Sequence, residues 1–434
     1  MAAPATASTS DREHLLGGIS SAFRVNPYTG GHLQVADAHG AHIRTTDGQS
    51  YIDMFMAHGS TVLGHAHPAV IAAVREVLEA GVIIGYEVEL GEQVARQIGN
   101  VVPSAEAVRF VASGSEAVTT ALRIARAVTG RDLVVKIDGH YNGASDYALV
   151  NSLAANTDAE NMGGSMSRRI PSSAGIPASI LESILPIPWN DLDALDAVLS
   201  TYGDQVAAVI MVPIDFNNGC ITPADGYLAA ALERAHAAGA LLIFDEVLSG
   251  LKVPGGSAQA MYGVTPDLTT VSKAMSSGVP LAAVVGRREP MEALLRPGPQ
   301  KPIQGGTYAG SALGLAAASA TLGLIEQGTL HADLLERAGG FFERLQAVFD
   351  RSPLPGRVQS VGCMFTVYVG TRDPVRDYRD MRALDPELAR RFFVRCIEEG
   401  LYFHTDFSVS AAHSQEILDE VLERMEGIAN EPGW

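Results

Sequence analysis

Apolar and polar positions follow two different rhythms along the chain. From Pro68 to Arg287, short runs rich in Val, Ile and Leu alternate with Ala-rich segments of helical periodicity. Short apolar runs predict buried strands, and the alternation predicts βα units around a parallel sheet. The expected strands are 108–112, 133–137, 207–212, 241–244, 268–271 and 281–285. The expected helices are 68–80, 91–102, 116–129, 191–202, 227–238 and 311–327.

After Gln327 long amphipathic stretches replace the short apolar runs. They predict helices at 330–350, 386–399 and 414–429, around a strand at 363–369. The segment before residue 68 carries glycines at short intervals, which favours an arm with short strands.

These rhythms predict an α/β fold with two unequal domains. We expect an N-terminal arm at 1–67, a large domain with a mostly parallel, doubly wound sheet at 68–327, and a C-terminal part at 328–434. The arm and the C-terminal part are expected to form a smaller α+β domain. A chain of 434 residues suits this division, because single cores stop growing at about 250–300 residues.

The acidic balance of the chain limits its partners. A formal net charge of −18 repels nucleic acid and anionic lipid, so we expect neither as a partner. No uninterrupted apolar run reaches the roughly 20 residues of a membrane span. Cys220, Cys363 and Cys396 are odd in number and lack metal-type spacing. They are expected to be unpaired thiols of a cytoplasmic protein.

Two segments are expected to be irregular. Residues 1–10 are rich in Ala, Ser and Thr and lack the basic start and apolar run of a signal peptide, which predicts a disordered tail. Residues 151–180 are polar and rich in Gly and Ser. Long loops in compact domains are usually functional or mobile, so we interpret this one as a lid.

The segment from Val108 to Val118 runs from a strand through a tight turn into a helix. Gly114 lets the backbone approach a ligand, Ser113 or Ser115 can cap the helix, and free amides at a helix start attract anions. A phosphate site fits, although ordinary capping explains the same residues. The segment is not a nucleophile elbow, because no glycine lies two residues to either side of Ser115.

A second segment, 241–247, is an apolar strand that ends in two acids, Asp245 and Glu246. The carboxyl end of a parallel strand faces the ligand crevice, so one acid would be buried beside a ligand and would require a cationic partner. A protonated ring nitrogen is such a partner. The alternative is a strand end whose acids meet solvent. A glycosidase carboxylate pair is disfavoured, because adjacent strand residues point to opposite faces.

The third segment is 269–275, a strand that ends in Lys273. The chain has only four lysines, and one at the end of a buried strand is placed to lose its proton by desolvation and act as a nucleophile. A lone lysine is more often a solvated charge. The combination of anion turn, buried acid and strand-end lysine favours the chemical interpretation.

Two other kinds of site are disfavoured. A nicotinamide dehydrogenase needs a Gly-x-Gly-x-x-Gly turn after the first strand, and none opens this sheet. His65 and His67 stand one residue apart without a matching set of ligands, so we expect no metal.

Taken together, several motifs resemble the class III aminotransferase family of fold-type I enzymes dependent on pyridoxal 5'-phosphate (PLP), and most closely the proteins similar to glutamate-1-semialdehyde 2,1-aminomutase. The resemblance is continuous over about residues 30–330. The motifs are Tyr51-Ile-Asp53, Gly64-His-Ala-His-Pro68, Ser113-Gly-Ser-Glu-Ala117, Gly139-His-Tyr-Asn-Gly143, Asp245-Glu-Val247, Ser272-Lys273 and Gly305-Gly-Thr307.

The resemblance implies the roles of four residues around the cofactor ring. Lys273 would hold PLP as a Schiff base and carry the proton from the substrate Cα. Asp245 would pair with the pyridine nitrogen and keep it protonated, so that the ring accepts electrons. Tyr141 and Val247 would pack on the two faces of the ring. The expected catalytic residues are Lys273, Asp245 and Tyr141.

The resemblance also implies how the cofactor phosphate is bound. Gly114 and Ser115, with Ser113 beside them, would bind it through amides and hydroxyl groups. Thr307 would reach the phosphate in the neighbouring subunit, which implies a homodimer.

Departures from the family pattern bear on the substrate. Asn142 replaces the usual His, Val212 replaces a Glu, and Phe216 fills a glycine position. The glutamate that pairs with a gating arginine in relatives is Asn217 here, which argues against glutamate or 2-oxoglutarate as co-substrate.

Three residues are candidates for substrate binding. His58 stands where the aminomutase pattern usually has Trp, and Phe216 would narrow the pocket. Tyr86 is the third.

These residues predict an aminotransferase that cycles between PLP and its amino form, pyridoxamine 5'-phosphate (PMP). It would move an amino group from a small amine or amino acid to a carbonyl acceptor. An aminomutase or an amino-acid epimerase of the same family begins by breaking the same Cα–H bond and stays open. A non-catalytic binding protein with this fold is disfavoured, because Lys273 and Asp245 are both present.

Overall fold

The computed structural model describes residues 14–153 and 166–434. The tail expected at 1–10 and the middle of the segment 151–180 lie outside the described residues. The chain divides into two compact units. Unit 1 comprises Met1–Pro68, His331–Pro374 and Ala383–Trp434, and unit 2 comprises Ala69–Leu330 and Val375–Arg382. The units change after Pro68 and after Leu330. The functional domain boundaries that we expected after residues 67 and 327 stay a prediction.

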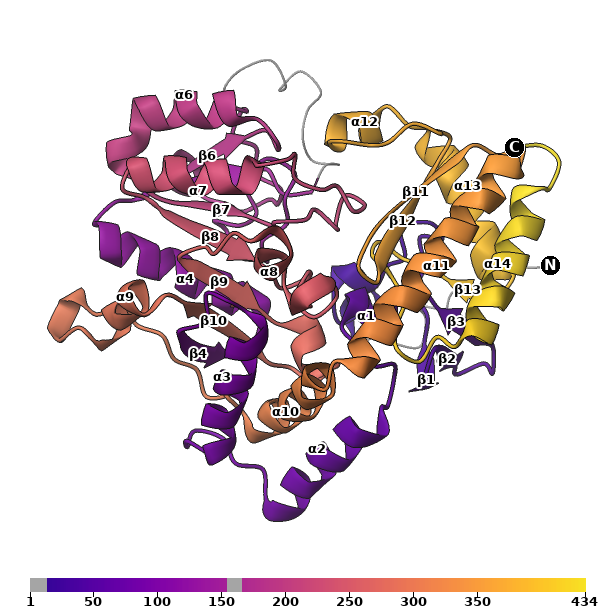
Figure 1. Cartoon of the computed structure of the whole chain (residues 1–434), viewed down its shortest axis with the longest axis horizontal. Helices are drawn as coiled ribbons and strands as arrows, with labels where there is room; N and C mark the ends of the chain where they lie inside the picture. Colours follow the sequence, from indigo (N-terminus) through magenta and orange to yellow (C-terminus); the bar gives the residue numbers. More distant parts are fainter. Residues whose placement is uncertain (1–13, 154–165) are drawn as a thin grey trace. The chain divides into compact units, whose positions relative to one another are not determined.

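Unit 2 is built on a sheet that has seven strands within the described ranges, in the order β4-β10-β9-β8-β7-β5-β6 (Figure 1). Strand β10 is antiparallel to both of its neighbours, and the other pairs are parallel. The mostly parallel α/β sheet predicted from the hydrophobic pattern is thereby confirmed. The strands are β4 (Ala107–Val111), β5 (Leu133–Ile137), β6 (Ile184–Ile187), β7 (Val206–Met211), β8 (Leu241–Asp245), β9 (Leu268–Val271) and β10 (Ala282–Gly286).

The central strands are buried because both faces of the sheet are covered. Every residue of β7 and β9 is buried. Strand β7 is apolar throughout, as is typical of a buried parallel strand, whereas β9 also contains the buried Thr269 and Thr270. Strand β6 was not predicted. It is only four residues long and contains Pro186, which suits its place at the edge of the sheet and hides it from a strand pattern.

The helices of unit 2 cover this sheet. Helix α4 packs on β4 and on β7 to β10, α7 packs on β8, and α6 packs on β6 and α7. The helices are α2 (Pro68–Ala80), α3 (Glu89–Val101), α4 (Gly114–Thr129), α5 (Ala178–Glu182), α6 (Leu192–Tyr202), α7 (Tyr227–Ala237), α8 (Ala258–Tyr262), α9 (Arg288–Met291), α10 (Ala312–Glu326) and α12 (Tyr378–Arg382).

Unit 1 joins the N-terminal arm to the C-terminal part, because β13 pairs in parallel with β3. One sheet has the order β1-β2-β3-β13 and another the order β11-β12-β14. Helices α13 and α14 pack side by side (Figure 1). The elements are β1 (Val35–His39), β2 (His42–Thr45), β3 (Ser50–Asp53), α1 (Met56–Gly59), α11 (Thr329–Arg351), β11 (Gly356–Val361), β12 (Met364–Val369), α13 (Pro386–Glu398), β13 (Leu401–Tyr402), β14 (Phe407–Ser408) and α14 (Gln415–Ala429).

Two expectations about the whole chain meet the structure here. Among the described residues, no helix combines the length and apolar character needed to cross a membrane. Cys220, Cys363 and Cys396 are buried, and none of them forms a disulfide within the described residues, which agrees with the sequence-based expectation.

Candidate active site

A cavity lies in unit 2 where several strands end. Its walls come from the start of α4, the loops after β5 and β7, the end of β8 and the residues after β9. The lining residues are Gly114, Ser115, Val118, Tyr141, Asn142, Gly143, Val212, Asn217, Asp245, Val247, Leu248, Ser272 and Lys273. Six residues that the sequence predicted for a cofactor site are thus brought together: Gly114, Ser115, Tyr141, Asp245, Val247 and Lys273.

Asp245 is the last residue of β8 and is only 5% exposed. Its Oδ1 accepts from the Thr270 hydroxyl at 2.9 Å and from the Val247 amide at 3.2 Å, and its Oδ2 accepts from Asn142 Nδ2 at 3.0 Å. Burial raises the pKa of Asp245, while these hydrogen bonds and the charge of Lys273 act in the opposite direction. A buried carboxylate is stabilised by a cationic partner, so Asp245 suits a cation bound in the cavity.

Lys273 lies in the same cavity, directly after β9, where it begins the short helix η8 (Lys273–Ser276). Its backbone has a φ of +48°, the left-handed conformation that side chains other than glycine rarely adopt. The neighbouring Ser272 hydroxyl donates to the carbonyl of Leu281 at 2.8 Å. Strain of this kind persists where the surrounding structure enforces it, and it is common at functional sites.

The start of α4 faces the cavity with unpaired backbone amides. The Ser113 hydroxyl caps the helix by accepting from the Glu116 amide at 3.3 Å, and Ser113 does not line the cavity. A Cβ at Gly114 would stand 3.0 Å from both methyl carbons of Val247, so only glycine allows this approach without displacement. The helix start therefore offers an anion site beside Val247, in the same cavity.

The loop after β5 reaches across this helix start. Gly143 has a φ of +98°, and a Cβ there would stand 2.8 Å from the Ser115 hydroxyl oxygen. The Ala144 amide donates to that oxygen at 3.0 Å. Because Ser115 accepts this bond, its own hydroxyl proton is available for an acceptor such as a phosphate oxygen.

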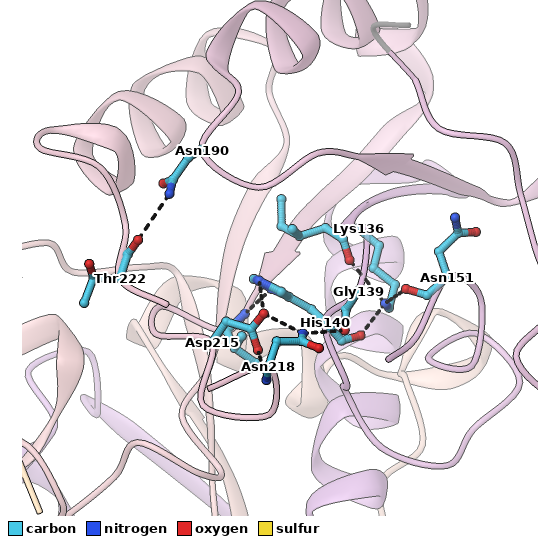
Figure 2. A network of polar contacts seen from close by, with 10 residues as sticks. Lys136, Gly139, His140, Asn151, Asn190, Asp215, Asn218 and Thr222 are labelled. Atoms are coloured by element: carbon cyan, nitrogen blue, oxygen red, sulfur yellow. Dashed lines mark hydrogen bonds and ion pairs between the residues drawn. The ribbon is translucent and has the colours of Figure 1, made fainter. Parts of the chain in front are cut away.

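A buried lysine, Lys136, anchors the loop after β5 through hydrogen bonds to its backbone (Figure 2). Lys136 lies in β5 and is 1% exposed, and its Nζ donates to the carbonyls of His140 at 2.6 Å, Asn151 at 3.2 Å and Ile137 at 3.3 Å. Burial lowers the pKa of Lys136 to about 7. Three carbonyl acceptors satisfy its three donors, which ties the residues before Tyr141 to β5.

Further contacts join this loop to the loop after β7 (Figure 2). Asn218 Nδ2 donates to Asp215 at 2.6 Å and to the Gly139 carbonyl at 3.2 Å. His140 Nδ1 accepts from the Val212 amide at 3.2 Å, and burial, followed by the charge of Lys136, keeps the pKa of His140 well below its ordinary value. His140 is therefore neutral and structural.

Sequence reasoning missed Lys136 and its partners as parts of the site. A lysine inside an apolar strand, in a chain with four lysines, was the available signal.

Other candidates from the sequence do not line this cavity. Phe216 is 3% exposed and packs in the interior, and its neighbour Asn217 lines the cavity instead. The apolar ring is thus withdrawn from the polar wall and does not narrow it. Thr307 is exposed, and Tyr86 is 80% exposed.

His58 belongs to unit 1. Its Nδ1 lies 2.7 Å from the carboxylate of Asp406, which is 2% exposed. Three consecutive residues, Met56, Ala57 and His58, have positive φ values of 48°, 53° and 57°. His58 is therefore held in one orientation by a strained backbone and a buried acid.

The fold and the cavity define an α/β enzyme with an anion site, an amine and a buried acid at the carboxyl ends of its strands. The chain matches the family Aminotransferase class-III over residues 25–426. It belongs to this family.

Relatives and solved structures agree with this assignment. A glutamate-1-semialdehyde 2,1-aminomutase from Thermus thermophilus is 38% identical over 421 residues, which cover 95% of this chain and 96% of that protein. An omega-transaminase from Sphaerobacter thermophilus superimposes with a TM-score of 0.89 at 26% identity, covering 96% of this chain and 95% of the other. A glutamate-1-semialdehyde-aminomutase from Pseudomonas aeruginosa PAO1 in complex with PMP gives 0.83 at 25% identity, covering 96% and 92%.

The protein is therefore a PLP-dependent enzyme of the aminotransferase or aminomutase type with fold type I. The cavity fits this cofactor. The start of α4 and the Ser115 hydroxyl suit a phosphate, Asp245 suits a protonated ring nitrogen, and Lys273 supplies the amine.

Proposed function

We propose that the protein moves an amino group between an amine or amino acid and a carbonyl compound, with Lys273 as the amine that holds PLP. One observation carries this proposal: Lys273, in a left-handed backbone conformation, lines the same cavity as the buried Asp245. The charge of Lys273 lowers the pKa of Asp245, so the two groups interact electrostatically.

Each residue around the ring has a separate task in this proposal. When bound, PLP supplies a ring that accepts the electrons released as a bond at the substrate Cα breaks. The Asp245 carboxylate would keep the ring nitrogen protonated. Val247 and Tyr141 would contact the ring and orient it. Lys273 Nζ would take the proton from the substrate Cα and return it where the new C–H bond forms.

The phosphate would be held by α4. The amides of Gly114 and Ser115 and the Ser115 hydroxyl donate to phosphate oxygens. Ser113 contributes through the helix cap, which its hydroxyl forms with the Glu116 amide. The Ala144 amide, in the loop that contains Gly143, donates to the Ser115 hydroxyl oxygen. This bond leaves the hydroxyl proton of Ser115 for a phosphate oxygen.

The substrate side of the proposal includes His58 and Tyr86. His58 is held by Asp406, which supports a recognition role because an imidazole fixed at Nδ1 presents its Nε2 in one direction. Tyr86 is exposed and available for contact. Phe216 would act indirectly, by packing behind Asn217, which lines the cavity.

A homodimer completes the proposal, with Thr307 reaching the phosphate of the neighbouring subunit. A second hollow shares Ser115 with the cofactor cavity and is lined by residues 303–305. Ile303 is 77% exposed and Tyr308 64% exposed, and two large apolar side chains so close to Thr307 suit a surface covered by another subunit. We place the enzyme in the cytoplasm, because its buried cysteines form no disulfide within the described residues.

An aminomutase is the second candidate. The relative at 38% identity bears that name, and an aminomutase uses the same residues to return the amino group to a neighbouring carbon of one substrate. An amino-acid epimerase would also begin with removal of the Cα proton by Lys273.

The test is a visible spectrum of the PLP-loaded protein during addition of α-, β- and ω-amino acids and simple amines. If a donor abolishes the visible band and a keto acid restores it, the protein is an aminotransferase and the donor defines the substrate class. A band that persists while the donor's Cα hydrogen exchanges with solvent supports the aminomutase or epimerase. Absence of any band after PLP is supplied contradicts the role of Lys273.

A further inference from the structure

Asn142 contacts the catalytic acid from the loop after β5. It is 1% exposed and lines the cavity, and its Nδ2 lies 3.0 Å from Asp245 Oδ2. An ionised carboxylate only accepts hydrogen bonds, so the amide must turn its NH₂ group toward Asp245 and its carbonyl oxygen away. The contact therefore sets the orientation of Asn142.

This orientation leaves Asn142 incompletely bonded. Its Oδ1 is buried and has no hydrogen-bond partner among the described residues. An unpaired buried carbonyl oxygen is unfavourable, so the position is poorly explained by stability alone. The Oδ1 atom of Asp245 already has two donors, Thr270 and Val247, whereas Asn142 donates to Oδ2.

We propose that Asn142 is a positioning residue that holds Asp245 Oδ2 in place for the ring nitrogen of PLP. This inference rests on the proposed function, in which Asp245 pairs with that nitrogen. The loop that carries Asn142 is itself anchored by Lys136 and Asn218 (Figure 2). Because the loop is anchored, the side chain of Asn142 is held in place, and its hydrogen bond in turn fixes the carboxylate of Asp245.

The uncharged side chain of Asn142 has a second consequence. An amide does not titrate, so the proton shared by Asp245 and the ring nitrogen is not coupled to another ionising neighbour at this contact. Asn142 therefore adds no titrating group to those that already interact electrostatically with Asp245, which are Lys273, Lys136 and Tyr141.

The experiment is a double-mutant cycle measured as the dissociation constant of PLP by equilibrium dialysis. We expect Asn142→Leu to raise this constant about 10- to 100-fold, the range for a hydrogen bond to a charged group. In an Asp245→Asn background the same substitution should change it less than about threefold, because the carboxylate that Asn142 positions is gone.

Asn218→Leu is the matched control. It removes a buried amide that anchors the same loop through the Gly139 carbonyl and that bonds Asp215 instead of Asp245 in the contacts it makes there. Its effect on PLP binding should therefore stay the same in the Asp245→Asn background.

The outcomes separate two failures. If Asn142→Leu weakens binding equally with and without the Asp245 carboxylate, Asn142 only shapes the loop and the inference is overturned. If Asp245→Asn by itself changes neither the dissociation constant nor the visible spectrum, the role of Asp245 in the proposed function fails.

If Asn142→Leu does not fold, Asn142→Asp tests the same contact with Asp245. The new carboxylate would stand about 3 Å from Asp245, and such a pair shares a proton. We expect the visible spectrum of bound PLP to gain a pH titration step that the wild type lacks. A spectrum with the same pH dependence as the wild type contradicts the inference.

Discussion

Asp245 and Glu246 are adjacent at the end of β8, and both are buried acids whose pKa is raised by burial. Their surroundings differ. Asp245 lines the cavity, and Asn142 donates to its Oδ2. Glu246 does not line it and accepts from the Ser249 hydroxyl at 2.9 Å, from the Ala258 amide at 2.5 Å and from Gln259 at 3.0 and 3.2 Å.

The comparison teaches how one strand end can serve two purposes. Successive strand residues point to opposite faces, so one acid enters the cavity and the next enters the packing behind it. We call these the cavity side, with Asp245 and Lys273, and the packing side, with Glu246 and Gln259. Changes on the cavity side should affect function more than stability, and changes on the packing side should do the reverse.

The largest effect is expected on the cavity side, for Lys273→Ala. Loss of the amine and of the proton carrier should lower kcat/KM by about 10³-fold or more, while the free energy of unfolding without cofactor changes by less than about 0.5 kcal/mol. Turnover with the identified donor and urea unfolding measure the two quantities. Lys301→Ala, which removes an exposed lysine, is the control and should leave both unchanged. Full turnover of Lys273→Ala would refute the assignment.

On the packing side, Glu246→Ala should cost about 2–4 kcal/mol of unfolding free energy. The substitution leaves the donors of Ser249, Ala258 and Gln259 unpaired in the interior and opens a small cavity. Urea unfolding of the cofactor-free protein measures this. The matched variant Asp245→Asn should cost less than about 1 kcal/mol, and equal losses for the two would remove the distinction between the sides.

Gly143→Ala tests how strictly the backbone of the cavity side is held. Its Cβ would meet Ser115 at 2.8 Å in a backbone with a φ of +98°, so we expect a loss of about 1–3 kcal/mol and weaker PLP binding. Gly130→Ala is the control, because Gly130 also has a positive φ of +70° but open space around it. It should cost less and leave PLP binding unchanged; equal PLP affinity for both variants would show that the Ser115 contact does not matter.

The smallest expected effect is a pH dependence. Burial raises the pKa of Asp245 above its unfolded value, so between these two values the folded state binds more protons than the unfolded state. The contribution of Asp245 to stability is therefore present at low pH and is lost as pH rises through this window. Asp245→Asn removes it, so unfolding measured without cofactor should favour the variant increasingly as pH rises through this window. Glu246, whose pKa is also raised, is present in the wild type and in Asp245→Asn, so its titration cancels in the comparison. A difference in unfolding free energy that does not depend on pH would contradict the prediction.

Much of the fold and part of the site followed from local patterns. Segments rich in Val, Ile and Leu predicted strands β5 and β8 to within a residue at each end, because buried parallel strands carry such residues, and β9 was predicted as closely although two of its four residues are threonines. The turn at Gly114, the acid at the end of β8 and the lysine after β9 were each visible where a predicted strand ends. Strand β6 was missed because a proline interrupts a short edge strand.

The sequence by itself determined which residue types stand at the ends of the strands, since hydrophobic periodicity places the strands and the parallel sheet brings their ends together. Only the tertiary structure decided where each side chain points. It turned Phe216 into the core and Asn217 into the cavity, and it assigned the Ser113 hydroxyl to the helix cap. It also joined Lys136 and Asn142 to the site through contacts between separate loops. Such contacts depend on the packing of segments distant in sequence, which no local pattern encodes.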